Sequence, residues 1–259
     1  MTRILTALVL IPLVVWIVLE GPQWSMLAIM VAVGLVAFYE FDSIAAKQGI
    51  ARSGLAGMLA GLAFLLTPEP AWLTLVVASA VLMTLELRQS DLGKAMSGAA
   101  TALLGVVYIF GAWRCALALR EIDPPFGPHW LMIALLVSWA GDTVAMYVGR
   151  AFGRHKLAPR VSPMKTWEGA IGSVVGGVLA AGIYAHFLIP SAALGKVLAV
   201  AACANVAGQL GDLCKSAFKR GAGVKDSGTT LPGHGGWLDR IDSSLFSIPV
   251  VYALLRVLI

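Results

Sequence analysis

The sequence predicts an all-α membrane protein, a bundle of nine spanning helices with the N-terminus in the cytoplasm. Of its 259 residues, 59% are hydrophobic and only 13% are charged, whereas soluble domains carry about 25% charged residues. The apolar residues gather into runs that approach the roughly 20 residues needed to cross the hydrocarbon of a bilayer. The basic residues fall mostly between alternate runs, so that they lie on one side of the predicted bundle.

The nine apolar runs account for most of the chain. In order they are 3–20, 24–41, 53–67, 70–87, 96–118, 129–149, 169–189, 191–211 and 243–259. Backbone groups inside a bilayer must hydrogen-bond within their own segment, so each run is predicted to be helical. The first run could be misinterpreted as a signal peptide. Further apolar runs follow it instead of a small-residue cleavage site and a soluble domain, so we interpret it as the first membrane helix.

The charge distribution gives the orientation and supports an odd number of spans. One side receives 15 basic residues, namely Arg3, Lys47, Arg52, Arg88, Lys94, Arg150, Arg154, Lys156, Arg160, Lys165, Lys215, Lys219, Arg220, Lys225 and Arg240. The other side receives 4, namely Arg114, Arg120, Lys196 and Arg256. Because cytoplasmic loops are enriched in Lys and Arg, the larger set and the N-terminus are predicted to be cytoplasmic and the C-terminus external. If the protein is bacterial, the membrane that it spans would be the inner membrane.

The composition also argues against two other classes of protein. A net charge of +5 would suit nucleic-acid binding, but the basic residues sit in short loops where they orient helices and meet anionic lipid or substrate, so no nucleic-acid partner is expected. The cysteines Cys115, Cys203 and Cys214 form no CxxC pair. A disulfide framework or a zinc site is therefore not expected.

Two glycine pairs have the GxxxG spacing that lets helices approach closely. They are Gly57 with Gly61 and Gly172 with Gly176. Such pairs arise by chance in a chain with 28 glycines, and we interpret them as sites of close helix packing rather than as a dedicated dimer face. The sequence leaves a homodimer open.

Two long polar segments, 150–168 and 212–242, separate the later runs and carry the candidate chemistry. On a helix, Asp212, Lys215 and Lys219 would share one face, and Ser216 would join them. Asp239 and Asp242 lie one turn apart just before the last run. The Gly- and Pro-containing stretch between these ends can fold back and bring them together.

Clustered carboxylates and cations suit the handling of phosphates. Carboxylates hold Mg²⁺, and the metal and cations together neutralise phosphate oxygens. Glycines let backbone N–H groups approach an anion. The alternative is a solvated loop with surface salt bridges, which is reasonable for any single charge. It is a poor account of the whole set, because ionisable groups at membrane level are costly and usually functional.

The pattern of these residues resembles a known family. From Ser216 the chain reads Ser216-x-x-Lys219-Arg220-x4-Lys225-Asp226-x-Gly228-x3-Pro232-Gly233-His234-Gly235-Gly236-x2-Asp239-Arg240-x-Asp242. This is similar to the signature of the phosphatidate cytidylyltransferases, also called CDP-diacylglycerol synthases. A second segment, Asp142, Gly149, Gly153 and Ser162-Pro163-x-Lys165-Thr166-x-Glu168-Gly169, resembles another recurrent segment of that family. Residues 1–95 resemble the family only in hydropathy.

The resemblance implies an enzyme that makes CDP-diacylglycerol and pyrophosphate from CTP and phosphatidate, in contact with membrane lipids. Its cofactor would be Mg²⁺, with Mn²⁺ as an alternative, and a second, monovalent cation is left open. The catalytic set is Asp212, Lys219, Arg220, Lys225, Asp226, Asp239, Arg240 and Asp242, of which Asp212, Asp239 and Asp242 are the predicted metal ligands. The substrate-binding set is Ser162, Lys165, Thr166, Glu168, Ser216, His234 and Asp142. His234 would equally suit a turn, and Asp142 stands out because it interrupts an apolar run.

Two other functions remain open. A CTP-dependent polyprenol kinase also joins membrane spans to CTP chemistry, although the long signature argues against it. A transporter would suit Asp142, but the carboxylates cluster in loops rather than across several spans. We expect one integral membrane domain over 1–259, with N-terminal spans in 1–95 and the active site in 96–259.

Overall fold

The computed structural model describes residues 2–89, 91–122, 125–231 and 235–258. Contacts divide the chain into two compact units, each described separately below. Unit 1 comprises Met1–Arg3, Trp24–Arg114 and Phe218–Arg240. Unit 2 comprises Ile4–Gln23, Cys115–Ala217 and Ile241–Ile259.

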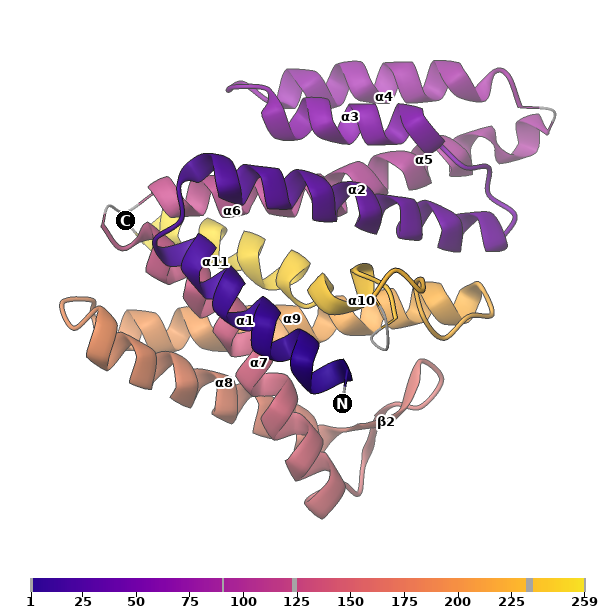
Figure 1. Cartoon of the computed structure of the whole chain (residues 1–259). Helices are drawn as coiled ribbons and strands as arrows, with labels where there is room; N and C mark the ends of the chain where they lie inside the picture. Colours follow the sequence, from indigo (N-terminus) through magenta and orange to yellow (C-terminus); the bar gives the residue numbers. More distant parts are fainter. Residues whose placement is uncertain (1, 90, 123–124, 232–234, 259) are drawn as a thin grey trace. The chain divides into compact units, whose positions relative to one another are not determined.

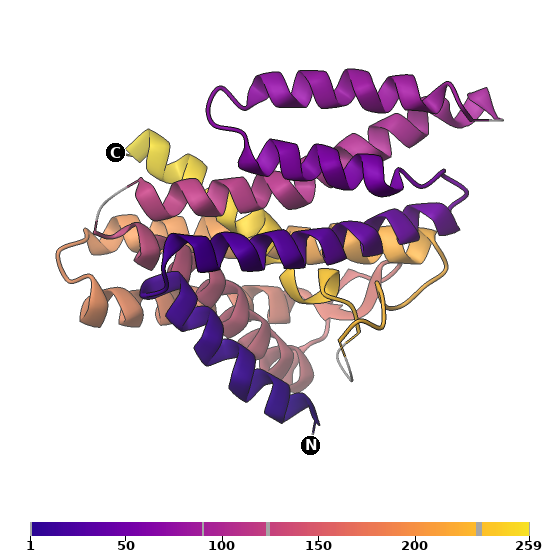
Figure 2. The same cartoon turned by 45° about the horizontal axis from the view of Figure 1, so that its top comes forward.

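Unit 1 is built on α2 (Gln23–Lys47), followed by the antiparallel helices α3 (Gly54–Leu66) and α4 (Trp72–Glu86), which lie side by side in both views (Figures 1 and 2). A short 3-10 turn η1 (Leu92–Lys94), α5 (Ala95–Gly105) and the π-helical turn η2 (Val106–Gly111) follow. The buried carboxylate of Asp42 in α2 accepts hydrogen bonds from Ser53 N at 3.0 Å and Gly54 N at 2.9 Å, so it satisfies free donors at the start of α3.

Unit 2 contains all or most of α1 (Thr2–Leu19), α6 (Ala112–Glu121), α7 (Gly127–Phe152), α8 (Trp167–Leu188), α9 (Leu194–Gly221) and α11 (Ser244–Leu258). From Phe218 onward, α9 belongs to unit 1. The turn-like helix α10 (Leu238–Ile241) joins the two units in sequence. Two short antiparallel strands, β1 (Lys156–Ala158) and β2 (Ser162–Thr166), form a hairpin between α7 and α8 (Figure 1).

The helices confirm the predicted fold class. Each of the nine apolar runs coincides with a helix in the described residues, the fifth run with the joined segment Leu92–Glu121. Five of these helices are long and apolar enough to cross a membrane, and Leu8–Leu19, Gly54–Leu66 and Trp72–Glu86 are shorter apolar helices. The chain is thus an all-α membrane protein, whereas the number of crossings and the orientation stay predictions.

Both GxxxG pairs serve close helix packing, as expected from their spacing. A Cβ atom at Gly57 would lie 2.5 Å from the ring of Phe38, and one at Gly61 would lie 2.2 Å from the ring of Phe110. In unit 2, added Cβ atoms at Gly172 and Gly176 would collide with valines of α7 at 2.9 and 2.5 Å. The absence of side chains at these positions lets neighbouring helices touch.

The largest difference between a helix and the run that predicted it is at the end of α9. The apolar run was expected to end at residue 211, but α9 continues through the polar residues to Gly221. The helical face proposed for Asp212, Lys215, Ser216 and Lys219 is therefore real. The added turns are held by packing within unit 1, where the rings of Phe218 and Phe41 meet edge to face at 6.2 Å.

Candidate active site

Helix α9 carries residues of two charged clusters, and buried amides fix its position in unit 2. Asn205, only 2% exposed, donates from Nδ2 to Val137 O at 2.9 Å and to Ser173 Oγ at 3.2 Å. Gln209 donates to Asn205 Oδ1 at 2.8 Å and to Ala170 O at 3.1 Å. These bonds tie α9 to α7 and α8, one and two turns before Asp212. These bonds were not predicted from the sequence, although amides in an apolar run are the signal of such interhelical bonds.

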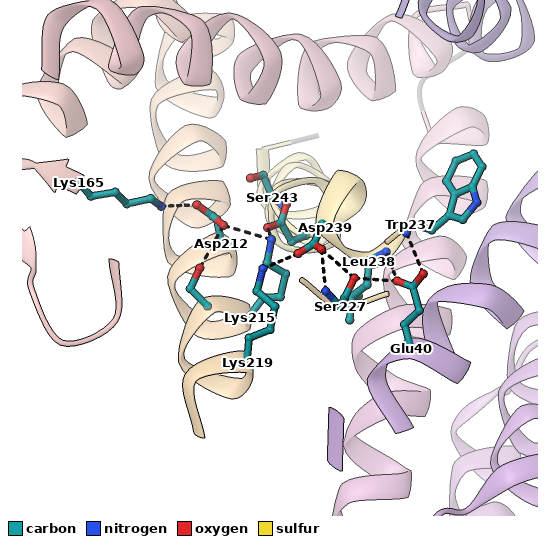
Figure 3. Close-up of polar contacts among 12 residues, drawn as sticks. Glu40, Lys165, Asp212, Lys215, Lys219, Ser227, Trp237, Leu238, Asp239 and Ser243 are labelled. Carbon is teal, nitrogen blue, oxygen red and sulfur yellow. Dashed lines mark hydrogen bonds and ion pairs between the residues drawn. The ribbon is translucent and has the colours of Figure 1, made fainter. Parts of the chain in front are cut away.

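The first cluster belongs to unit 2 and is called here the Lys215 cluster: Lys165, Asp212, Lys215 and Asp242 (Figure 3). Asp212 pairs with Lys165 from β2 and, at 3.3 Å, with Lys215 one turn along α9. Lys215 also pairs with Asp242. Because Lys215 is 4% exposed and Asp242 5% exposed, these charges are largely removed from water, and each needs its partners.

A glycine lets the two aspartates of this cluster approach each other. A Cβ atom at Gly211, the residue before Asp212, would lie 2.8 Å from the carbonyl oxygen of Asp242 and 2.7 Å from the ring of Phe246. The backbone around Asp242 therefore rests directly on α9. Asp242 Oδ1 also accepts a hydrogen bond from Ser243 N at 2.8 Å. This contact fixes the carboxylate just before α11 begins.

Burial raises the pKa of the Asp242 carboxyl above its usual range. The loss of hydration disfavours the charged form; the Lys215 ammonium opposes this effect, and the nearby Asp212 carboxylate reinforces it. Two carboxylates thus compete for one buried ammonium. A further cation would relieve that competition.

The second cluster belongs to unit 1 and is called here the Glu40 cluster: Glu40, Lys219, Ser227 and Asp239 (Figure 3). Asp239 Oδ1 accepts from Lys219 Nζ at 2.6 Å, while Oδ2 accepts from Ser227 N at 2.8 Å and lies 3.0 Å from Ser227 Oγ. Ser227 Oγ lies 2.8 Å from Glu40 Oε2. Glu40 is the functional candidate that the sequence analysis missed. Its signal was a carboxylate inside an apolar run, which is costly without partners.

The candidate residues in and next to the β1–β2 hairpin make different contacts. Lys165 reaches Asp212, whereas the buried Thr166 caps α8 by accepting from Gly169 N at 3.1 Å. Gly153 makes room for this threonine, because a Cβ atom there would lie 2.8 Å from Thr166 Cγ2. Glu168 pairs with His155 Nδ1 at 2.6 Å. Ser162 pairs in register with Ala158 across the hairpin. Substrate contacts by Ser162, Thr166 and Glu168 stay predictions.

The remaining candidates are mostly exposed. Exposed side chains are those of Arg220, Lys225, Asp226, Arg240 and Asp142, and their contacts with substrate stay predictions. Ser216 Oγ lies 3.5 Å from Asp212 Oδ1, at the outer limit of a hydrogen bond. His234 lies outside the described residues.

The residues of the Lys215 cluster fit a magnesium ion in part. Among the described residues, no group of three His, Cys, Asp or Glu side chains is arranged to hold a metal. Mg²⁺, however, is usually bound by one or two carboxylates together with substrate phosphates and water. Asp212 and Asp242, which share Lys215, supply such a pair. Asp239 belongs to the other unit, and its role as a ligand stays a prediction.

Comparison with known proteins gives the family. The model of the cytidylyltransferase family matches residues 1–258. A phosphatidate cytidylyltransferase of Brucella abortus biovar 1 (strain 9-941) is 36% identical over 97% of this chain and 91% of its own length. The phosphatidate cytidylyltransferase of Staphylococcus haemolyticus (strain JCSC1435) is 34% identical over 98% of this chain and 97% of its own. That of Thermotoga maritima is 31% identical over 99% and 96%. The chain belongs to the cytidylyltransferase family.

Proposed function

We propose that this protein transfers the cytidylyl group of CTP to phosphatidate, forming CDP-diacylglycerol and releasing pyrophosphate. One observation carries the proposal: the ion pair between Lys165 and Asp212 brings together the two polar segments 150–168 and 212–242. These segments carry the two sequence patterns, and their contact within unit 2 creates a partly buried, charged cluster suited to phosphates. The curated relatives named phosphatidate cytidylyltransferase supply the identity of the lipid substrate.

The reaction is an exchange of phosphoanhydride bonds. A phosphatidate oxygen attacks the α-phosphorus of CTP, the bond between the α-phosphorus and the bridging oxygen breaks, and the electron pair leaves with pyrophosphate. The phosphomonoester is largely dianionic at neutral pH, since its second pKa is about 6, so it needs no strong base. The protein must instead bring two polyanions together and stabilise the leaving group, which is positional and electrostatic work.

The Lys215 cluster can do this work by exchanging partners. Lys165 and Lys215 neutralise Asp212 and Asp242 when no substrate is bound. An incoming phosphate offers these ammonium groups new partners and leaves the carboxylates available for a cation. Mg²⁺ held by Asp212 and Asp242 would supply positive charge to the phosphate oxygens. The exposed cations Arg220, Lys225 and Arg240 are proposed to guide the anions.

We propose further that this chemistry takes place at the cytoplasmic face of the membrane. CTP is a cytosolic nucleotide and the phosphatidate headgroup lies at the interface, so they meet at headgroup depth. The asymmetry of 15 basic residues against 4 supports this orientation. A reporter placed in 150–168 should read as cytoplasmic and one after Arg256 as external. The same side for both would rule out the nine-span arrangement.

Position-specific labels separate the candidate reactions. Purified protein is incubated with phosphatidate or a polyprenol and with CTP labelled at either the α- or the γ-phosphate. Transfer of the α label to lipid, requiring phosphatidate, is expected. Transfer of the γ label to a polyprenol would establish a kinase instead, and no labelled lipid in any arm would leave a transporter as the alternative.

The Lys165 interaction can be tested with a matched variant on the same hairpin. Lys165→Ala removes the contact with Asp212, whereas Lys156→Ala removes an exposed lysine of β1. The first should lower kcat/KM on the order of tenfold to a hundredfold, because it removes a charge-assisted bond worth about 1.5–3 kcal/mol, and the second should have little effect. Equal effects of the two lysine variants would remove the cluster from the mechanism.

Chelation of divalent metal by EDTA should abolish the activity of the wild type, and added Mg²⁺ or Mn²⁺ should restore that activity.

A further inference from the structure

Glu40 lies within an apolar helix, yet it is among the most fully hydrogen-bonded side chains of unit 1. It sits in α2 and is 2% exposed. Among the described residues, the Glu40 carboxylate accepts four hydrogen bonds from the segment 227–238, nearly two hundred residues further along the chain. Such burial of a carboxylate is costly unless its oxygens are satisfied, which makes this arrangement a specific one.

The four donors come from both ends of that segment. Oε1 accepts from Thr230 Oγ1 and, at 3.1 Å, from Trp237 N. Oε2 accepts from Ser227 Oγ at 2.8 Å and from Leu238 N at 2.9 Å. Each carboxylate oxygen therefore holds one hydroxyl from 227–230 and one backbone N–H from 237–238. One side chain joins the start and the end of the glycine-rich segment (Figure 3).

The segment is shaped to receive this carboxylate. A Cβ atom at Gly236 would lie 2.2 Å from Glu40 Oε2 and 2.1 Å from Ser227 Oγ. One at Gly228 would lie 2.7 Å from Glu40 Oε1. Any side chain at these two positions would displace Glu40. Two glycines of the signature pattern thus have a physical explanation in the space that Glu40 occupies.

Ser227 connects Glu40 to the ion pair of Asp239 and Lys219. Its hydroxyl lies near both carboxylates but has a single proton to donate. Asp239 Oδ2 already accepts from Ser227 N at 2.8 Å, and Oδ1 accepts from Lys219 at 2.6 Å. The hydroxyl proton is therefore best placed on Glu40. Glu40 then orients Ser227 so that its backbone N–H faces Asp239.

We infer that Glu40 is a positioning residue: it joins residues 227–230 to residues 236–238 and thereby fixes Asp239 against Lys219. It acts through Asp239 rather than by contact with substrate. The activity measurements below rest on the proposed function, whereas the hydrogen-exchange measurement does not.

The substitution Glu40→Gln isolates the role of the second acceptor oxygen. Glutamine keeps the size of the side chain but offers one carbonyl oxygen and an NH₂ group that cannot accept. In either orientation the NH₂ group faces one hydroxyl and one backbone N–H. The hydroxyl can rotate away, but the backbone N–H of Trp237 or Leu238 is left without an acceptor.

Asp42 provides a matched control on the same helix. It is also a buried carboxylate of α2, and it accepts from the backbone N–H groups of Ser53 and Gly54. Asp42→Asn should therefore disturb the start of α3 and leave the hydrogen bonds of Glu40 intact. Comparing the two variants separates a specific effect of Glu40 from a general effect of altering a buried carboxylate in α2.

Hydrogen exchange on the detergent-solubilised full chain tests the structural step. Glu40→Gln should speed exchange about tenfold, the factor for one charge-assisted bond, in the peptide containing Trp237 and Leu238, but not in that containing Ser53 and Gly54. Asp42→Asn should do the reverse. Equal exchange of the Trp237 peptide in wild type and Glu40→Gln would overturn the inference, whatever the enzyme does.

Kinetics test the functional step. Glu40→Gln should lower kcat on the order of tenfold to a hundredfold, as expected when a reacting group is misplaced, and Asp42→Asn should keep kcat per folded molecule. In a Lys219→Ala background, Glu40→Gln should have little further effect, because both changes disable the same pair. If the losses of kcat caused by Glu40→Gln and Lys219→Ala multiply in the double variant, the inference is overturned. An inactive wild type would instead refute the proposed function.

A milder pair of variants applies if Glu40→Gln does not fold. Thr230→Val removes one hydroxyl donor to Glu40, and Thr229→Val alters its exposed neighbour. Faster exchange of the Trp237 peptide in Thr230→Val alone supports the inference. The same exchange in both variants overturns it.

Discussion

The Lys215 cluster and the Glu40 cluster both bury carboxylates, but they satisfy them in different ways. In the Lys215 cluster, Asp212 and Asp242 are neutralised mainly by ammonium groups at the ends of long side chains. In the Glu40 cluster, backbone N–H groups and hydroxyls supply most of the donors, and Lys219 adds one charge.

This difference indicates different tasks. A lysine ammonium is a point charge on a flexible stem, so it can leave a carboxylate for a phosphate without moving the backbone. A backbone N–H cannot change partner unless the chain moves. The Lys215 cluster is thus suited to exchanging ligands, and the Glu40 cluster to holding residues 227–230 and 236–238 together. The two clusters should respond differently when a charge is removed.

The largest expected effect on stability follows from Lys215→Met. This change keeps an apolar stem but leaves Asp212 and Asp242 without the ammonium that they share. Breaking a buried ion pair by removing one partner costs about 3–5 kcal/mol. Lys219→Met should cost about 1.5–3 kcal/mol, because Asp239 keeps the backbone N–H of Ser227 as a donor. Reversible unfolding in detergent measures both values, and an equal loss would show that the clusters do not differ as described.

The next effect concerns catalysis in the Lys215 cluster. Asp212→Asn and Asp242→Asn keep the size of the side chain and remove one charge. Each should lower turnover by more than the roughly 100-fold that the loss of an outer-shell partner costs at a metal site. The double variant should be little worse than either single variant, because residues that act as a unit are not additive.

The assay for these variants is CTP-dependent formation of CDP-diacylglycerol at ordinary and raised Mg²⁺, alongside protein yield and melting. Both changes remove a carboxylate that pairs with the buried Lys215, so melting should fall, most in Asp242→Asn, and turnover is compared per folded molecule. Near-normal turnover in either single variant would remove that carboxylate from the site. Two losses that multiply in the double variant would show that the aspartates do not share one ion.

Smaller effects are expected from the cations at the end of α9. Arg220 is exposed, so Arg220→Ala should raise the concentration of CTP or phosphatidate required and leave the melting temperature unchanged. Lys219→Ala should raise the same requirement and also lower kcat and stability through Asp239. Each lost charge-assisted bond should cost about 1.5–3 kcal/mol. Steady-state kinetics with each substrate varied in turn will show which substrate is affected. Wild-type kinetics in both variants would indicate that Lys219 and Arg220 only help to orient the chain in the membrane.

Much of the fold could be predicted because hydropathy acts locally. An apolar run of sufficient length must be helical in a bilayer, whatever its neighbours, and every predicted run proved to be a helix in the described residues. The polar extension of α9 and the hairpin were not predicted as elements. Both depend on contacts with residues outside the run, such as Phe218 with Phe41 and Thr166 with the glycines of α7.

The candidate site shows the same limit. Asp212, Asp239 and Asp242 could be named from their spacing in a polar segment, but their partners could not. Lys215 was noted only as a member of a helical face, yet it is the buried ammonium of its cluster. Glu40 lies far from the signature in sequence and within an apolar run. Only the folded chain shows that its carboxylate and the signature segment meet.

The smallest effect is expected at Thr166, where the structure offers a capping role beside the predicted contact with substrate. Its hydroxyl accepts from Gly169 N at 3.1 Å and starts α8, directly after the lysine that reaches Asp212. Thr166→Ala should lower the free energy of unfolding by about 1 kcal/mol, the usual cost of losing an N-cap. Thr166→Ser keeps the hydroxyl and should recover most of that loss, less the packing of one methyl group against Gly153. If capping is the whole role, both variants keep the wild-type KM for CTP and phosphatidate. A raised KM in the alanine variant, with unchanged stability, would show that the hydroxyl contacts substrate. The hairpin that supplies Lys165 would then bind substrate together with the Lys215 cluster.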